Sequence, residues 1–234
     1  MSFSGAKFIR TKFTKNFYIY GADFSNTNFT GADLYADRTG SIFGKGIFVK
    51  AQFIDAILER SNFTGSNLSG ADFTGANLTS ANLAETDIRN ANFDGANLTS
   101  VLITNANLSS VNFRGANLTD ASIFSADLTG ANLTGANLTN ADLTNSNLTN
   151  SNLTGAILTD ADLTNLNLTD ADLTNSNLTD ADLTNSNLTG AILTGANLTG
   201  AILTNSNLTR DDAIRRGAIF TDEKFNFGVL IKKI

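Results

Sequence analysis

A repeat of five residues runs through most of this chain of 234 residues. From Phe43 to Leu208 every fifth residue is Phe, Leu or Ile, and the residue two places before it is usually Ala or Ser. Such self-similarity constrains a fold more than any other sequence feature. A period of five fits neither the 3.6-residue turn of an α-helix nor the two-residue alternation of a long β-strand. It fits a coil made of very short strands, each followed by a turn.

One repeat unit shows how such a coil can form. Residues 131–135 read Ala-Asn-Leu-Thr-Gly. Ala and Leu lie two residues apart and share one face of a strand, while Asn and Thr point to the other face. The turn that follows is Leu-Thr-Gly-Ala, and its third residue alternates along the chain among Gly, Asn, Asp and Ser, which tolerate a positive φ. Hydrophobic pattern and turn chemistry therefore both predict an all-β solenoid with an apolar interior.

The repeated units resemble the pentapeptide-repeat family, whose motif is Ala/Ser-Asp/Asn-Leu/Phe-x-x, over about residues 2–208. The resemblance implies a right-handed, four-sided β-solenoid with four pentapeptides, hence twenty residues, in each coil. Phe53, Phe73, Phe93 and Phe113 are twenty residues apart, which supports this coil length independently and predicts a stack of Phe rings in the core. At about 4.8 Å a coil, roughly ten coils give a rod about 50 Å long.

The repeat predicts a solenoid over residues 1–208, with two shifts of register, near 14–19 and 35–42. The second shift has two interpretations. It is either a bulge that the solenoid absorbs or a protruding recognition loop that carries Tyr35, Asp37 and Arg38.

Residues 209–234 are predicted to cap the last coil with a short helix and a strand. Thr209 or Asp211 is a suitable N-cap for the helix, and Gly217 is suited to end it. Four apolar residues of this segment are expected to be buried, either in the cap or in a C-terminally mediated homodimer: Phe220, Phe225, Phe227 and Leu230.

Composition argues against an enzyme. The chain has no His and no Cys, which removes the commonest general base, thiolate nucleophiles and disulfides, so neither a metal nor a cofactor is expected. No motif of an activated Ser, Thr or Lys nucleophile is present. No signal peptide and no apolar run long enough for a membrane span is found, so we expect a cytoplasmic protein in a bacterial setting, with no membrane partner.

Charge is distributed unevenly. The net charge is −6, but residues 1–60 carry eight cations against five anions, whereas residues 61–209 carry two cations against thirteen anions. In a coil of twenty residues, six carboxylates of the second region form an acidic stripe along one corner: Asp120, Asp142, Asp160, Asp162, Asp180 and Asp182. No direct binding of nucleic acid is expected from such a surface.

The acidic stripe has three interpretations. It can simply solvate the surface, or it can bind Ca²⁺ through carboxylate oxygens, although no calcium-binding motif supports that. It can also imitate the phosphates of DNA. The resemblance implies this third interpretation, because some pentapeptide-repeat proteins bind DNA gyrase. A separate hypothesis is that the outward Asn-Leu-Thr arrays bind ice. The sequence favours a non-enzymatic rod that binds a protein partner, with the topoisomerase (gyrase) binder as first alternative and the ice binder as second.

Overall fold

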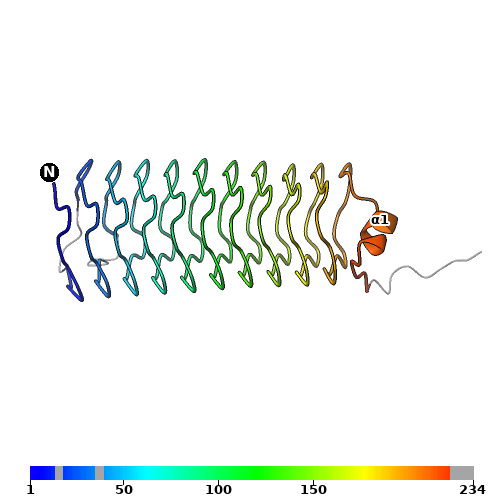
Figure 1. The fold of residues 1–234 in the computed structure, drawn as a ribbon, viewed down its shortest axis with the longest axis horizontal. Coiled ribbons are helices and arrows are strands. Elements are labelled where there is room, and N and C mark those ends of the chain that lie inside the picture. The colour runs from blue at the N-terminus through cyan, green and yellow to red at the C-terminus, as the bar shows by residue number, and fades with distance from the viewer. Residues whose placement is uncertain (14–17, 35–39, 222–234) are drawn as a thin grey trace, which may run out of the picture.

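The computed structural model describes residues 1–13, 18–34 and 40–221. In this part the chain winds as a solenoid from its N-terminal end to the single helix, α1 (Arg210–Arg215), at the other end (Figure 1). The strands are so short that each contributes one residue to an isolated bridge, and every bridge is parallel. The prediction of an all-β solenoid is confirmed.

The bridges fall into four columns that run along the rod. From Ile42 to Asp182 each bridge joins residues that are twenty apart, such as Ile42 with Asn62. We name the columns by their first bridges: A (Tyr18–Ile42), B (Ser2–Asp23), C (Lys7–Asn28) and D (Lys12–Asp33). Face A denotes the column A residues together with the residue two places after each of them. Corner D–A denotes the turn that leads from column D to column A in each coil.

Each turn has the geometry that the sequence predicts. In the turn at Leu118, the amide of Ala121 donates to the Leu118 carbonyl at 3.1 Å, and Asp120 between them has a φ of 56°. The same position has a positive φ in turn after turn, and most of its occupants are Gly, Asn, Asp or Ser. Lys50 and Arg60 also adopt this conformation, which is unfavourable for a side chain with a Cβ atom by about 1 kcal/mol.

The core is a set of stacked layers. Ring centroids are 4.8 Å apart between Phe53 and Phe73, and 4.6 Å apart between Phe73 and Phe93. The prediction of a Phe stack is therefore confirmed, and the stack continues past Phe113 only as Leu side chains, beginning with Leu133. Stacked rings at this separation lie within the range that aromatic pairs prefer.

Both shifts of register fall at the same corner. Lys12 pairs with Asp33, 21 residues away, and Tyr18 pairs with Ile42, 24 residues away, before the spacing settles at twenty. The extra residues of the first two coils thus lie between column D and column A, and the bridges on either side continue. The four columns of bridges continue past both insertions. Tyr35, Asp37 and Arg38 lie outside the described residues, so the recognition loop remains a prediction.

Gly40 is the first described residue after the second insertion, where the chain rejoins the solenoid. Its φ is +75°, and a Cβ atom placed on it would lie 2.1 Å from the carbonyl oxygen of Arg60 in the next coil. Beside it, the hydroxyl of Ser41 donates to the Leu34 carbonyl at 2.7 Å. Only glycine fits where the backbones of two coils approach so closely.

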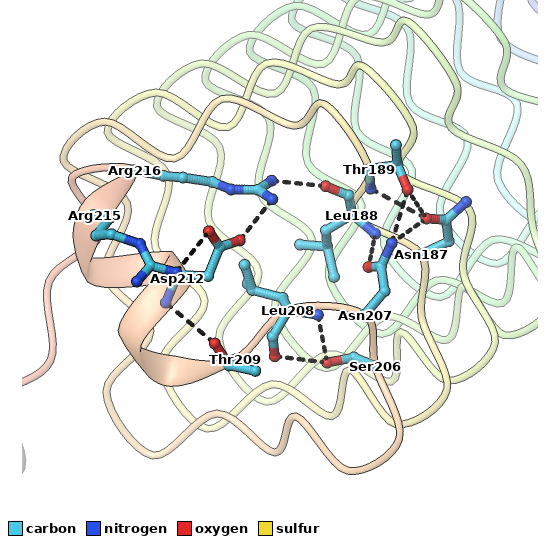
Figure 2. A network of polar contacts seen from close by, with 10 residues as sticks. All are labelled: Asn187, Leu188, Thr189, Ser206, Asn207, Leu208, Thr209, Asp212, Arg215 and Arg216. Carbon is cyan, nitrogen blue, oxygen red and sulfur yellow. Dashed lines mark hydrogen bonds and ion pairs between the residues drawn. The ribbon is translucent and has the colours of Figure 1, made fainter.

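Helix α1 covers the C-terminal end of the rod (Figure 1). Thr209 is its N-cap and accepts from the amide of Asp212 at 3.2 Å, and Gly217 follows it with a φ of 87°. Arg216 forms an ion pair of 2.6 Å with Asp212 and donates to the Leu188 carbonyl at 3.0 Å (Figure 2). These contacts tie the helix to the last coils.

The chain then returns to the solenoid, where Ile219 bridges Asn197 in column D. Phe220 packs partly buried against the core, and the guanidinium of Arg210 lies 4.2 Å from its ring centroid. Phe225, Phe227 and Leu230 lie outside the described residues. Whether the remaining tail caps the rod or forms a homodimer therefore stays a prediction.

Candidate functional site

Column B carries a ladder of hydrogen bonds between side chains. The side-chain nitrogen Nδ2 of Asn167 donates to two oxygens of the preceding coil, Asn147 Oδ1 at 3.1 Å and Thr149 Oγ1 at 3.0 Å. Its Oδ1 accepts from the Thr169 hydroxyl at 2.6 Å. The pattern continues to Asn207 at the end of the rod, which Figure 2 shows beside Asn187 and Thr189. Outward Asn and Thr side chains here stabilise neighbouring coils, because each donor has an acceptor one coil away.

Columns C and D are linked in the same way. In column D, Asn137 donates to the Thr119 hydroxyl of the preceding coil at 3.0 Å, and in column C, Asn132 donates to Asn112 Oδ1 at 2.9 Å. The recurrent Asn and Thr of the sequence thus have a structural role on these columns.

Column A lacks this ladder. From Asn62 to Ile202, none of its described residues donates a side-chain hydrogen bond to the neighbouring coil. After Asn82, aliphatic, Ser and Asp residues replace Asn, and Asn62 and Asn82 themselves are not joined by a side-chain hydrogen bond. The column reads Tyr18, Ile42, Asn62, Asn82, Leu102, Ser122, Asp142, Asp162, Asp182, Ile202.

Three predicted site residues stack in this column. Asp142 bridges Asp162, and Asp162 bridges Asp182, as the twenty-residue spacing predicts. Each carboxylate accepts from the amide two residues later, as Asp162 does from Thr164 at 3.0 Å. A carboxylate offers no donor to the coil before it, so three like charges lie one above another at the strand spacing of about 4.8 Å. Such stacking is unfavourable for the fold.

The other three predicted residues lie at corner D–A, next to column A. Asp120, Asp160 and Asp180 occupy the positive-φ position of their turns and are exposed. This second row of carboxylates, along corner D–A, is interrupted. Asn140 takes the position between Asp120 and Asp160, and its side-chain amide donates to Asp120 Oδ1 at 3.0 Å. Asp180 folds over the next turn, where a Cβ atom on Gly200 would lie 1.9 Å from its Oδ1. The corner is acidic, but less regularly than spacing alone suggests.

Face A also exposes apolar side chains. Tyr18 and Tyr20 are 64% and 69% exposed, and Tyr20 lies against Gly44 of the next coil. Phe124 is 36% exposed in the middle of the rod, at a position that Thr usually occupies. These residues were missed as site candidates. The signal was available, because each breaks the Asn-Leu-Thr pattern at an outward position.

Asp23, which accepts from the Ser25 amide at 2.9 Å, and two further carboxylates outside the acidic stripe have a pKa below the usual value. A bidentate hydrogen bond from Arg89 holds the pKa of Asp87 below its usual value and raises the pKa of Arg89. In column C the hydroxyl of Thr174 lowers the pKa of Asp172. Both pairs are local contacts within a single strand and turn.

The structure describes residues 1–13, 18–34 and 40–221. Within them, no helix is long and apolar enough to cross a bilayer. No three acidic, His or Cys side chains there come together as a metal site would require.

The profile described as "Pentapeptide repeats" matches residues 18–35, 102–140, 126–165 and 167–205, and "Pentapeptide repeat region" matches residues 36–113. The chain belongs to the pentapeptide-repeat family. No curated protein matches this pentapeptide-repeat chain.

Solved structures of the family resemble it. HetL of the cyanobacterium Nostoc sp. strain PCC 7120, described as involved in heterocyst differentiation regulation, is 29% identical, with 95% of this chain and 88% of HetL covered and a TM-score of 0.34. QnrB1, described as a plasmid-mediated fluoroquinolone resistance protein, is 20% identical, with 86% of this chain and 95% of QnrB1 covered and a TM-score of 0.50. A pentapeptide repeat protein of the Arabidopsis thaliana thylakoid lumen is 37% identical, with 42% of this chain and 68% of that protein covered and a TM-score of 0.22. Likeness at the level of QnrB1 supports the fold alone.

Proposed function

We propose that this pentapeptide-repeat protein is a non-enzymatic, right-handed, four-sided rod of about ten coils that binds a protein partner through face A and corner D–A. One observation carries the proposal. Columns B, C and D use their outward Asn and Thr side chains to bond neighbouring coils, whereas column A has stacked carboxylates and exposed apolar groups in their place. Residues that weaken a fold and face solvent are best explained by binding.

A rod of this kind suits a scaffold. Its backbone hydrogen bonds repeat in each coil, so the positions of outward side chains are fixed without a partner, and little conformational entropy is lost on binding. Acidic groups on the binding face favour a partner with a basic surface and disfavour nucleic acid.

The test compares face A with a matched face. In one variant Asp160, Asp162, Asp180 and Asp182 are changed to Asn, which keeps side-chain size and suits these positions. In the control, Asp170 and Asp172, in column C and the turn before it, are changed to Asn, the same kind of change on another face. We expect the parent and the control to retain a common set of bound proteins in quantitative affinity purification, and the face A variant to lose one. Equal retention by all three proteins would contradict the proposal.

The runner-up is a topoisomerase binder that imitates DNA. Asp160, Asp162 and Asp180 are exposed along one corner of a rod, which supports it, and a fluoroquinolone resistance protein shares the fold. The interruption at Asn140 weakens it, because duplex DNA carries a charge about every 1.7 Å. The assay is inhibition of DNA gyrase supercoiling across a titration of the protein, and inhibition that the quadruple Asp→Asn variant loses would favour this candidate.

Ice binding has less support. On columns B and D, Thr hydroxyls donate to Asn Oδ1 and accept from the Asn amide of the next coil, as Thr149 does between Asn147 and Asn167. Hydroxyls that are already bonded on both sides have less capacity to order water. A thermal hysteresis measurement tests this directly.

A further inference from the structure

The last coil of the rod leaves part of its core uncovered on one side. Side A of this coil denotes residues 201–205, which include Ile202 of column A. Leu203 of side A is only partly buried and Ile202 is 48% exposed, whereas Leu183, one coil earlier, is fully buried. Leu208, the next inward residue along the coil, is 2% exposed. The rod is therefore closed at Leu208 and open at Leu203.

The backbone of side A also has an unpaired outer edge. One coil earlier, the amide of Leu183 donates to the Ile202 carbonyl at 2.8 Å. The equivalent amides of side A, those of Leu203 and Asn205, have no backbone partner in the part of the chain that the structure describes. Such an edge can pair with a further strand.

The chain returns toward this open side after α1. Ile219 bridges Asn197 in column D, and the Thr221 amide donates to the Thr199 hydroxyl at 2.9 Å. Both residues follow their partners by 22 positions instead of twenty, because α1 replaces one side of this coil. Column D leads to column A through corner D–A, so Thr221, the last described residue, lies where the chain can next reach side A.

The residues that follow Thr221 keep the five-residue period. Phe225 follows Phe220 by five positions, as each inward residue of the repeat follows the one before it. Asp222 takes the turn position at corner D–A, which Asp160 occupies with a φ of 56° earlier in the rod. The sequence thus offers one more strand and a turn suited to reach it.

We propose that residues 223–226 form one further strand over side A of the last coil. The offset of 22 fixes the register and places Lys224 on Ile202 and Phe225 on Leu203. The strand supplies an acceptor for the Leu203 amide, and the Phe225 ring covers the Leu203 side chain. The occupant of the open side is the C-terminal tail of the same chain.

Connectivity and, with one exception, composition fit this tail to side A. Residues 222–234 begin next to the open side, so their local concentration there is far above that of a separate chain. The exception is Glu223, at an inward position that Ala or Ser usually occupies. Ala201, one coil earlier, is itself only partly buried, so a longer side chain above it has a path to solvent.

The added strand has two consequences for the rod. It extends face A by one level and ends it with a cation, Lys224, beyond Asp182 and Ile202. It also covers a strand edge on which a second rod could otherwise stack end to end. The inference does not depend on the use of face A for binding, so either can fail without the other.

The first experiment uses pairs of Cys substitutions, because the chain has no Cys. Two matched pairs lie directly opposite in the proposed register, at about 4.8 Å: Ile202→Cys with Lys224→Cys, and Thr204→Cys with Asn226→Cys. The crossed pairs, Ile202→Cys with Asn226→Cys and Thr204→Cys with Lys224→Cys, are about 8 Å apart. A disulfide requires Cα atoms within about 7 Å.

We expect each matched pair to form a disulfide within one chain at least about tenfold faster than either crossed pair. The four variants share the same substituted positions, so differences in reactivity between single sites cancel. Equal rates for matched and crossed pairs would overturn the proposal. Disulfides between two chains in dilute solution would overturn it as well, because they would make a second copy the occupant.

The second experiment measures hydrogen exchange at the amides of Leu203 and Asn205 in the full chain. Phe225→Asn should raise both exchange rates at least about tenfold, because the strand opens more easily without the ring. Phe227→Asn is the control, with the same substitution two residues later at the following turn, where Asn is well suited. Unchanged exchange in Phe225→Asn, or an equal increase in the control, would overturn the proposal. Protection in the parent that rises with protein concentration would also overturn it in favour of a dimer.

Discussion

Columns A and B pass through the same coils, five residues apart, and differ in what their side chains do. At one level Asn167 of column B exchanges hydrogen bonds with the coils on both sides, whereas Asp162 of column A accepts a single backbone amide. Their backbone bridges are the same. The backbone ladder and the apolar core therefore suffice to form the solenoid, and the outward positions can be used for either stability or binding.

The largest expected difference in stability is between truncation of one residue of column B and truncation of one residue of column A. Asn167→Ala should lower the free energy of unfolding by about 2 kcal/mol, because bonds to two neighbouring coils are lost together. Asp162→Ala should change it by less than about 0.5 kcal/mol, since one lost amide bond is offset by reduced repulsion. Urea denaturation of the two variants beside the parent checks this. Equal losses would show that column A is as structural as column B.

The inward Ser residues before each column give the next test. Ser66, before column B, accepts from the Gly46 amide and donates to the Phe43 carbonyl, both at 3.1 Å. Ser61, before column A, is buried and its hydroxyl has no hydrogen-bond partner among the described residues. Ser66→Ala should cost about 1 kcal/mol, whereas Ser61→Ala should be neutral or slightly stabilising. A clear loss of stability in Ser61→Ala, measured by the same denaturation, would mean that its hydroxyl is bonded in solution.

Converting column A to the pattern of column B should stabilise the rod. The triple change of Asp142, Asp162 and Asp182 to Asn removes three stacked charges and supplies amide donors, for a gain of up to about 1 kcal/mol. The parent should also gain more from added salt than the triple variant, because screening relieves the same repulsion. Thermal unfolding at low and high ionic strength measures both effects. A less stable triple variant would contradict the assignment of column A to binding.

The smallest effect concerns acid. Asp172 of column C stands apart from the stack, and the Thr174 hydroxyl lowers its pKa below the usual value of 3.8. A carboxylate whose pKa is lower in the folded state stabilises the fold above its unfolded pKa, and this contribution is lost as the pH falls through the folded pKa. Between pH 6 and pH 3 the parent should therefore lose slightly more stability than Asp172→Asn. Parallel denaturation curves at the two pH values provide the check, and identical losses would argue against the Thr174 contact.

Local chemistry made most of the fold predictable from the sequence. Alternation places Leu133 inward and Asn132 outward, and the turn residue selects a positive φ, so both features can be read within five residues. The Phe stack followed from a regular spacing of twenty. The helix after Leu208 was equally readable, because its caps, Thr209 and Gly217, are local signals.

The candidate site was predicted only in part. Stacking of Asp142 with Asp162 and Asp182 followed from the spacing, but the exposed aromatic residues of face A were passed over. The sequence analysis also did not predict that Asn140 interrupts the row of carboxylates at corner D–A. The reason is that its hydrogen bond to Asp120 joins residues of different coils. The recognition loop and most of the C-terminal apolar residues lie outside the described part of the chain.

By itself, the sequence determined the five-residue unit, its inward and outward sides and its turns, because these depend on residues that are neighbours along the chain. Only the tertiary structure decided that both insertions fall at corner D–A and that three columns carry side-chain ladders while column A does not. It also decided how Arg216 anchors α1 to Leu188. These features join residues about twenty or more positions apart, and winding alone sets which of them meet.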